Sequence, residues 1–329
     1  MRILVTGITG FAGSHLAEAL LSQQGVEIFG AARKASWPED TGRLASQVRL
    51  RECDLTNASG VDALLHDVQP ERVFHLAGYP HAGRSVREAD TAWTGNLTAT
   101  RNLYEAVVRW GRKPRILFVG SGLIYGDPEF ADQAFDEHAL LRPTTPYGAS
   151  KAAADLASYQ YTHTAGLEIV RARPFNHIGP RQSPEFAVAH FARQIAAIEK
   201  GRQQPLLETG NLSPRRDLTD VRDVARAYML LMEMGRSGEA YNIGSGATWS
   251  MQEVVDRLVA LSGTRVDVRQ RADLVRAKET AHIRADTAKL RQDTGWTPAF
   301  TLEQSLSHTL DYWRTALDAQ PLRSTTTNN

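Results

Sequence analysis

The sequence predicts an α/β protein in which a doubly wound parallel sheet is joined to a smaller, discontinuous α/β lobe. Short apolar segments, typical of buried strands, alternate with longer helical segments over the first half of the chain. A glycine-rich turn joins the first of these strands to the first helix. A length of 329 residues suits one large sheet domain with a smaller partner. In such a sheet, ligands bind beyond the carboxyl ends of the strands.

Six segments are expected to form the strands of this sheet. They are 2–6, 26–31, 48–55, 73–78, 115–120 and 167–173. We assign residues 1–174 and 218–245 to the sheet domain, and 175–217 and 246–317 to the smaller lobe. Residues 318–329 are expected to form a disordered tail because the polar end of the chain has nothing to bury.

The turn after the first strand contains three glycines, Gly7, Gly10 and Gly13. Glycine permits a tight bend and a close approach of the backbone to a ligand, and the N-terminus of the next helix can then face a pyrophosphate. The order of strand, glycines and helix predicts a Rossmann-type dinucleotide site rather than an ordinary βα turn. The residues of this turn that we expect to bind the cofactor are Gly7, Thr9, Gly10, Phe11, Ala12 and Gly13.

Two cations, Arg33 and Lys34, follow the second strand. An enzyme that uses NAD commonly places a carboxylate here, about 20 residues past the glycines, to bind the ribose 2′-hydroxyl. Two cations without an acid suit a 2′-phosphate instead, so the sequence predicts NADP(H), with NAD(H) as a possible second cofactor. The alternative is a solvated basic loop.

Further cofactor-binding residues are expected at the ends of other strands. Asp54 could accept a hydrogen bond from adenine, and capping of the next helix is an equal alternative. The small residues Ala77 and Gly78 leave room for a cofactor to cross, and Asn176 offers an amide near the nicotinamide end. The set at the strand ends is Asp54, Leu55, Leu76, Ala77, Gly78, Pro174, Asn176 and His177.

A helix is predicted to begin at Pro146, with Thr144 or Thr145 as its cap. Tyr147 and Lys151 are four residues apart on this helix and therefore share one face. A nearby ammonium favours the phenolate, so we expect Lys151 to lower the pKa of Tyr147 and make it a general acid or base for carbonyl chemistry. The alternative is a surface tyrosine and a surface lysine.

Ser121 follows the fifth strand, at the edge of the sheet where ligands bind. Its hydroxyl could bond both a substrate carbonyl oxygen and the phenol of Tyr147. A lone serine at a strand end is most often a turn former. The agreement of glycine turn, serine and tyrosine–lysine pair in order and location favours a catalytic site made of Ser121, Tyr147 and Lys151.

Composition excludes several other classes of protein. The charges nearly cancel, with 38 basic and 37 acidic residues, which argues against a nucleic-acid binder. The single cysteine, Cys53, excludes an internal disulfide, and no spacing for a metal site is found. No apolar run reaches the length of a membrane span, and no signal peptide precedes the first strand. We therefore expect a cytoplasmic protein.

These motifs resemble those of the extended short-chain dehydrogenase/reductases, the NAD-dependent epimerase/dehydratase family, over almost the whole chain. The resemblance rests on the three glycines, on Ser121-Gly-Leu-Ile-Tyr-Gly and on Tyr147-Gly-Ala-Ser-Lys151. It implies that Tyr147 is the acid/base, that Lys151 binds ribose and modulates the phenol, and that Ser121 orients the carbonyl. It adds Asn96, Tyr147 and Lys151 to the cofactor-binding residues and makes Asn96 a candidate for a proton-relay position. It also implies a homodimer formed through the fourth and fifth helices.

The second half resembles the GDP-sugar members of that family, the GDP-mannose 4,6-dehydratases and, more closely, the GDP-4-keto-6-deoxy-mannose reductases. The most specific phrases are Phe175-Asn-His-Ile-Gly-Pro180 and Gly210-Asn-Leu, followed by Arg215-Arg-Asp217. The substrate-binding residues that the resemblance implies are Ser121, Gly122, Leu123, Asn176, Arg181, Asn211, Arg216, Arg276 and Glu279. In the dehydratases a glutamate stands two positions after the catalytic hydroxyl residue, where this chain has Leu123.

The leading hypothesis is an NADPH-dependent reductase of the C4 ketone of a GDP-linked 4-keto-6-deoxy sugar, which yields GDP-D-rhamnose or a close relative. A nucleotide-sugar 4-epimerase or 4,6-dehydratase is the first alternative. A regulator that binds NADP without turnover is the second, and the intact Ser121, Tyr147 and Lys151 weigh against it because a sensor needs no proton donor.

Overall fold

The computed structural model describes residues 1–130, 132–275 and 282–319. The chain divides into two units that are described separately. The first comprises Met1–His177, Arg215–Thr248 and Thr280–Ala299, and the second comprises Ile178–Pro214, Trp249–Glu279 and Phe300–Asn329.

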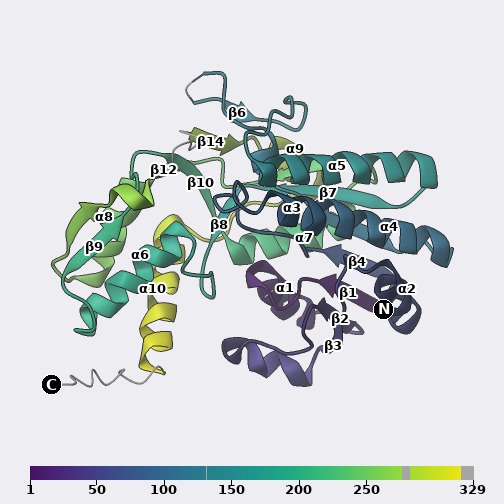
Figure 1. Cartoon of the computed structure of the whole chain (residues 1–329), viewed down its shortest axis with the longest axis horizontal. Coiled ribbons are helices and arrows are strands. Elements are labelled where there is room, and N and C mark those ends of the chain that lie inside the picture. The colour runs from purple at the N-terminus through teal and green to yellow at the C-terminus, as the bar shows by residue number, and fades with distance from the viewer. Residues whose placement is uncertain (131, 276–281, 320–329) are drawn as a thin grey trace. The chain divides into compact units, whose positions relative to one another are not determined.

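The first unit is built on a seven-stranded sheet with the order β11-β7-β5-β4-β1-β2-β3, and each neighbouring pair is parallel (Figure 1). The strands are β1 (Arg2–Thr6), β2 (Glu27–Ala32), β3 (Arg49–Glu52), β4 (Arg72–His75), β5 (Arg115–Val119), β7 (Ile169–Pro174) and β11 (Ala240–Ile243). The order reverses at β1, which is the switch point of a doubly wound sheet. The predicted fold class is confirmed.

Helices cover both faces of this sheet because successive side chains of a strand point to opposite sides. Ile3 and Val5 pack in one cluster with α1 (Phe11–Leu21) and α7 (Val221–Met234). Leu4 packs in the other with α2 (Ala58–Val68), α4 (Ala99–Trp110) and α5 (Pro146–Ala165). The shorter helical segments of this unit are η1 (Glu39–Ser46), α3 (Ala89–Trp93), η2 (Thr94–Thr98), η3 (Gly122–Ile124) and α9 (Ala288–Thr294).

A small parallel sheet in the same unit joins β10 (Arg215–Asp220), β14 (His282–Ala285) and β6 (Ala134–Phe135). The chain passes between the units near β8 (Asn176–Ile178) and β12 (Thr248–Ser250). We expected all of 246–317 in the smaller lobe, and Thr280–Ala299 differs from that expectation. The physical reason is that β14 pairs with β10, and that Trp296 is buried with its indole nitrogen donating to the carbonyl oxygen of Asp223 on α7 at 3.0 Å.

The second unit contains three helices that pack on one another, α6 (Ala187–Glu199), α8 (Met251–Ser262) and α10 (Leu302–Asp318). It also contains the parallel pair β9 (Leu206–Thr209) and β13 (Asp267–Gln270), and η4 (Ala272–Leu274). The predicted tail, 318–329, lies outside the described residues from position 320 onward, and Asp318 is the last residue of α10. Among the described residues, no helix is both long and apolar enough to cross a membrane.

Candidate active site

The glycine turn lies at the carboxyl end of β1 and leads directly into α1. Gly7 has φ +70, and a Cβ there would lie 2.8 Å from the backbone nitrogen of Ala77. A Cβ at Gly13 would lie 2.2 Å from the carbonyl oxygen of Gly7, and that oxygen is held in the turn because it accepts from the amide of Gly10 at 3.0 Å. Gly10 precedes the helix without a side chain to cap it, so the first amides of α1 can face an anion. The turn therefore fits a dinucleotide pyrophosphate.

A buried histidine fixes the strand next to this turn. His75 bonds Thr6 Oγ1 through Nδ1 at 2.8 Å and Thr100 Oγ1 through Nε2 at 3.0 Å. The amide of Ala77 donates to Thr6 Oγ1 at 3.1 Å, so the end of β4 is held against the end of β1. Burial, and then the charge of Lys151, lower the pKa of His75 to about 3, and the ring stays neutral. The sequence analysis gave no role to His75. A histidine within an apolar strand must find hydrogen-bond partners when it is buried, and that position was the available signal.

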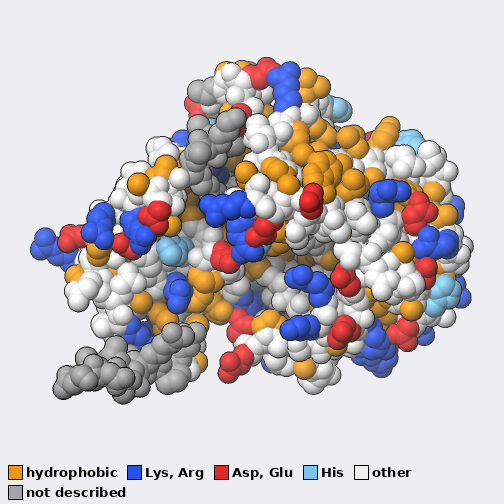
Figure 2. All heavy atoms as spheres, viewed as in Figure 1, with side chains coloured by type: hydrophobic (Ala, Val, Ile, Leu, Met, Phe, Trp, Pro, Cys, Tyr) orange, Lys and Arg blue, Asp and Glu red, His pale blue; other side chains and the backbone are white. Residues whose placement is uncertain are grey.

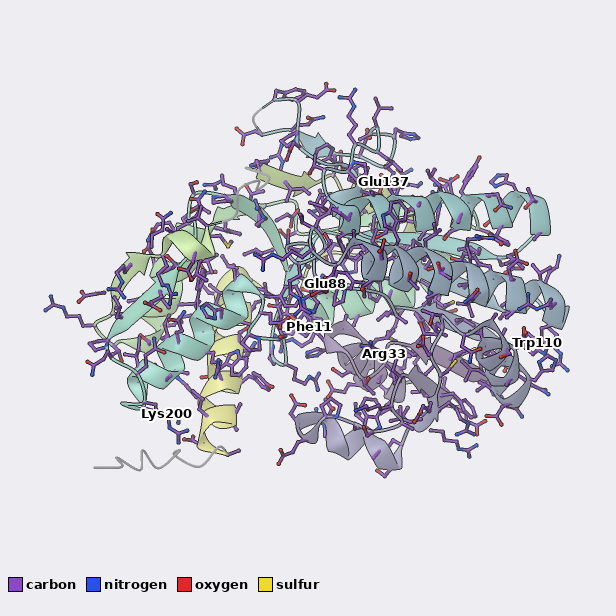
Figure 3. The ribbon with its side chains drawn as sticks, in the orientation of Figure 1. Phe11, Arg33, Glu88, Trp110, Glu137 and Lys200 are labelled. Carbon is purple, nitrogen blue, oxygen red and sulfur yellow. The ribbon has the colours of Figure 1, made fainter. Side chains whose placement is uncertain are left out.

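Arg33 and Lys34 follow β2 and are both exposed, as their predicted role requires. Arg33 is labelled in Figure 3. Asp54 accepts from the amide and the hydroxyl of Thr56, and these bonds, with a smaller effect of the Arg33 charge, lower the pKa of Asp54. The alternative in which Asp54 caps the next helix is wrong, because Asn57 is the cap of α2 and accepts from the amide of Gly60.

Ser121 and Tyr147 come together at the carboxyl end of β5. Ser121 is buried and begins the short helix η3, and its Oγ accepts from the amide of Leu123 at 3.2 Å. Tyr147 is half-buried in the first turn of α5, which Thr145 caps, as one of the two predicted caps. Burial raises the pKa of Tyr147, and a hydrogen bond with Ser121 acts in the opposite direction. The phenol is therefore protonated and suited to donate a proton.

Lys151 is buried one helical turn after Tyr147, and its Nζ donates to the carbonyl oxygen of Val119 at 3.0 Å. Burial lowers the pKa of Lys151 to about 8. The expectation that this ammonium lowers the phenol pKa is not met: burial dominates at Tyr147, and Ser121 supplies the opposing effect. The Lys151 ammonium nevertheless remains charged at neutral pH, since its pKa lies above 7.

Asn96 lies inside the π-helical segment η2, between α3 and α4. Single π-helical turns are frequent at functional sites. The Asn96 side chain accepts from the amide of Tyr79 at 2.8 Å and donates to Ser150 Oγ at 2.9 Å. A Cβ at Gly78 would lie 2.5 Å from Asn96 Oδ1 and 3.2 Å from Lys151 Nζ, so glycine is required beside both. The sequence analysis missed Tyr79 and Ser150 because their roles depend on the π-helical segment that places Asn96 between them.

The segment after β7 adds two residues to the same unit. The His177 ring stacks on the Phe11 ring at the start of α1, with centroids 5.7 Å apart and planes at 8°. Burial lowers the pKa of His177. Asn176 is exposed in β8, just beyond Pro174, which ends β7. The remaining cofactor candidates of the strand ends, Leu55, Leu76 and Ala77, lie at the positions expected after β3 and β4.

The predicted substrate residues fall in different parts of the chain. Gly122 lies against the Phe175 ring, and Leu123 packs against the apolar cluster that contains Phe175. Arg216 is half-buried on β10 of the first unit. In the second unit, Arg181 has φ +71 and Asn211 accepts from the amide of Ser213 at 3.0 Å. Arg276 and Glu279 lie outside the described residues.

The fold and the serine–tyrosine–lysine site define an extended short-chain dehydrogenase/reductase. The family described as GDP-mannose 4,6 dehydratase matches residues 4–309, and the chain belongs to that family. The resemblance on which the sequence interpretation rests is therefore confirmed.

Relatives and solved structures match over nearly the whole chain. GDP-6-deoxy-D-mannose reductase of Pseudomonas aeruginosa is 33% identical over 95% of this chain and 97% of its own length. dTDP-glucose 4,6-dehydratase of Streptomyces niveus is 30% identical over 95% and 93%. The structure of RMD from Pseudomonas aeruginosa complexed with NADPH has TM-score 0.83 and 32% identity, covering 96% of this chain and 99% of that one. UDP-glucose 4-epimerase of Thermus thermophilus, in complex with NAD, has TM-score 0.85 and 29% identity, covering 96% and 100%.

Proposed function

We propose that the protein is an NADPH-dependent reductase of the C4 ketone of a GDP-linked 4-keto-6-deoxy sugar, and that it forms GDP-D-rhamnose or a close relative. The relatives that match include reductases, dehydratases and epimerases of nucleotide sugars, so the family alone leaves all three reactions open. The choice among them rests on the residues around Ser121 and Tyr147.

The observation that carries the proposal is the hydrocarbon pair Leu123 and Ile124, which begins two positions after Ser121. A 4,6-dehydratase removes the proton at C5 and eliminates the C6 hydroxyl, which requires an acid and a base near those carbons. Isobutyl and sec-butyl side chains cannot exchange protons, and Ile124 is buried. Reduction of a ketone needs only the groups that Ser121, Tyr147 and Lys151 provide.

The proposed mechanism assigns one task to each of these side chains. NADPH, when bound, supplies the hydride for C4. The hydroxyls of Ser121 and Tyr147 hydrogen-bond the C4 ketone oxygen and hold it in place. As the oxygen gains negative charge, Tyr147 transfers its phenolic proton to it, and the raised pKa of Tyr147 ensures that this proton is present at neutral pH. Lys151, whose Nζ is held by the carbonyl oxygen of Val119, would bind a ribose hydroxyl of NADPH and so hold the cofactor beside Tyr147.

The choice of NADPH over NADH rests on Arg33 and Lys34. Both are exposed after β2, and the Arg33 charge acts on Asp54 at the end of the neighbouring strand β3. A guanidinium meets a phosphate through two parallel hydrogen bonds, which suits the 2′-phosphate. NAD(H) would lose this interaction and remain a weaker second cofactor.

A homodimer through α4 and α5 is part of the proposal. Large apolar side chains are exposed on these helices: Val108 on α4 is 43% exposed, and Leu156 and Tyr159 on α5 are 56% and 47% exposed. Figure 2 shows apolar side chains gathered over the region of α5. Exposed apolar groups on adjacent helices are typical of surfaces that another chain covers. Leu156→Lys should therefore convert the dimer to a monomer in light scattering.

The proposal is tested by following NADPH absorbance with a panel of GDP-, dTDP- and UDP-linked 4-keto-6-deoxy sugars. We expect stoichiometric oxidation of NADPH with the GDP-linked ketone, and much slower turnover with the other nucleotides. A 4-epimerase would instead interconvert sugar hydroxyls without net NADPH consumption, and that result would overturn the reductase assignment. Turnover should fall by about 10²–10⁴ in Tyr147→Phe, which separates catalysis by this site from chemical reduction.

A further inference from the structure

A buried network of charged and polar groups holds the catalytic helix α5 against the sheet. Asp155 lies on α5 one turn after Lys151 and is 0% exposed. It accepts from Arg173 on β7 through Nε at 3.0 Å and Nη2 at 2.8 Å, and from Arg171 Nη1 at 2.6 Å. A Cβ at Gly120 would lie 3.6 Å from Asp155 Oδ2, so the carboxylate lies beside the residue that precedes Ser121.

Arg173 extends this network to the segment that carries Ser121. Its Nη1 donates to the hydroxyl of Tyr125 at 2.9 Å and to the carbonyl oxygen of Glu137 at 3.2 Å. Tyr125 follows η3, four residues after Ser121, and is buried. The Tyr125 hydroxyl in turn donates to Asn242 Oδ1 at 2.7 Å on β11. One guanidinium therefore connects the helix of Tyr147 with the segment of Ser121.

Stability alone gives a poor account of such a network. A buried ion pair can be replaced by well-packed apolar residues with little loss of stability, so its contribution is better sought in a defined geometry. The geometry at stake here is the hydrogen bond between Ser121 and Tyr147, whose two residues lie on the two segments that Arg173 joins. A displacement of about 1 Å at a catalytic group can cost about 10²-fold in rate.

We propose that Arg173, acting through Asp155 on one side and Tyr125 on the other, is a positioning residue that sets the Ser121–Tyr147 contact. The inference rests on the proposed function for its kinetic consequence. It assigns to Arg173 and Tyr125 no contact with cofactor or substrate. Glu137, labelled in Figure 3, also joins the network, because its carboxylate accepts from the amide of Asn242 at 2.7 Å.

Arg171 offers a matched control on the same strand. It also donates to Asp155, but its other bonds go to the carbonyl oxygen of Gly238, at 2.9 and 3.2 Å, and its guanidinium lies 5.1 Å from the centre of the Tyr159 ring. Lysine at either position keeps a cation beside Asp155. Only at Arg173 does the substitution also remove the fork that binds Asp155 and Tyr125 together.

The first measurement is steady-state kinetics with NADPH and the GDP-linked ketone. Arg173→Lys and Tyr125→Phe should lower kcat by on the order of 10- to 100-fold with KM little changed, because misplacement affects the transition state. Arg171→Lys should stay within about twofold of wild type. An equal loss in Arg171→Lys and Arg173→Lys would overturn the proposal, because it would indicate a general structural effect. Tyr125→Phe keeps the test decisive if Arg173→Lys fails to fold.

The dependence of kcat on pH distinguishes a positioning role of Arg173 from a purely structural one, which would leave the pKa values in the profile unchanged. Tyr228 on α7 interacts electrostatically with Tyr147, Lys151 lies one turn further along α5, and the Ser121 hydrogen bond lowers the pKa of the Tyr147 phenol. Loss of that bond leaves the phenol protonated to higher pH. The basic limb of the kcat profile should therefore move to higher pH in Arg173→Lys and Tyr125→Phe, but not in Arg171→Lys.

A measurement without substrate separates this inference from the proposed function. In protein labelled with ¹³C at tyrosine Cζ, the Tyr147 resonance is identified by its loss in Tyr147→Phe. At pH 7 the chemical shift of this resonance should move, in Arg173→Lys and Tyr125→Phe, toward the value of a tyrosine phenol that has no hydrogen bond. In Arg171→Lys the chemical shift should stay at its wild-type value. A shift with no turnover of any ketone by wild type would reject the reductase proposal alone. An unmoved resonance would reject the positioning role of Arg173.

Discussion

Lys151 donates from Nζ to the carbonyl oxygen of Val119 at 3.0 Å, and Val119 is the last residue of the strand that leads to Ser121. The ammonium is thus fixed to the sheet from within α5. It also lies 5.8 Å from the centre of the Phe118 ring, and burial lowers the pKa of Lys151 to about 8. Lys151 therefore contributes a charge whose position is set by the backbone and whose presence depends on pH.

This pKa predicts how stability depends on pH. The pKa of Lys151 is lowered from 10.5 to about 8 in the folded chain, so between these values the unfolded chain binds more protons and stability rises with pH. The free energy of unfolding of wild type, measured relative to Lys151→Met by urea denaturation, should therefore increase between pH 8 and 10. The full shift corresponds to about 3 kcal/mol. A constant difference across this range would show that Lys151 is not perturbed by burial.

Tyr147→Phe removes the phenolic proton and keeps the ring. Turnover should drop by about 10²–10⁴, the usual range for the loss of a general acid, while the dissociation constant for NADPH changes little. The check is kcat from NADPH oxidation together with NADPH binding by fluorescence. Tyr159→Phe, on the exposed side of the same helix, is the control and should keep near-normal turnover. Near-normal turnover of Tyr147→Phe at every pH would contradict the mechanism.

Arg33→Ala tests the choice of cofactor. If Arg33 binds the 2′-phosphate, the variant should weaken NADPH by about 1.5–3 kcal/mol and leave NADH almost unchanged, because only NADPH offers the charged acceptor. Isothermal titration of both cofactors measures the difference. Arg112→Ala, an exposed arginine after α4 whose guanidinium lies 5.3 Å from the Trp110 ring centre, is a control for the general effect of charge. An equal loss of affinity for NADPH and NADH would show that Arg33 does not contact the 2′-phosphate.

The doubly wound sheet was predictable because its signals are local. Buried strands are visible in the sequence as apolar runs. The turn at Gly7 requires glycine because its backbone has a positive φ and passes close to Ala77, so the glycine itself marks the turn in the sequence. The spacing of Tyr147 and Lys151 likewise follows from helix geometry. These features require no knowledge of distant contacts.

The remaining features depend on contacts between segments far apart in the chain. Asp155 meets Arg173 and, through it, Tyr125, and nothing in the local sequence of α5 marks Asp155 as buried. The protonated state of Tyr147 also follows from tertiary burial, which outweighs the neighbouring cation that spacing alone suggests. Strand β14 was misplaced for the same reason, since its pairing with β10 joins residues more than 60 positions apart.

The last prediction separates reductase from dehydratase through Leu123. The Leu123 side chain packs with the apolar cluster around Phe175, and the Leu123 amide donates to Ser121 Oγ. These contacts fix the position of Ser121. A dehydratase of this family would need an acid/base group near C5 and C6, which an isobutyl group cannot provide. Incubated with GDP-mannose and NADP, the protein should form no 4-keto-6-deoxy product.

Supplied with that 4-keto-6-deoxy product and NADPH, the same preparation should oxidise NADPH in a one-to-one ratio with the ketone consumed. This incubation with the ketone and NADPH is the control that the protein is active. The incubation with GDP-mannose and NADP is measured by borohydride trapping of any ketone formed and by chromatography of the sugar. Appreciable dehydration of GDP-mannose would contradict the reductase assignment, because a proton-transferring group other than the residue at position 123 would then have to act at C5. Since a 4-epimerase also lacks this dehydration, the stoichiometry of NADPH consumption is what distinguishes the reductase from that alternative.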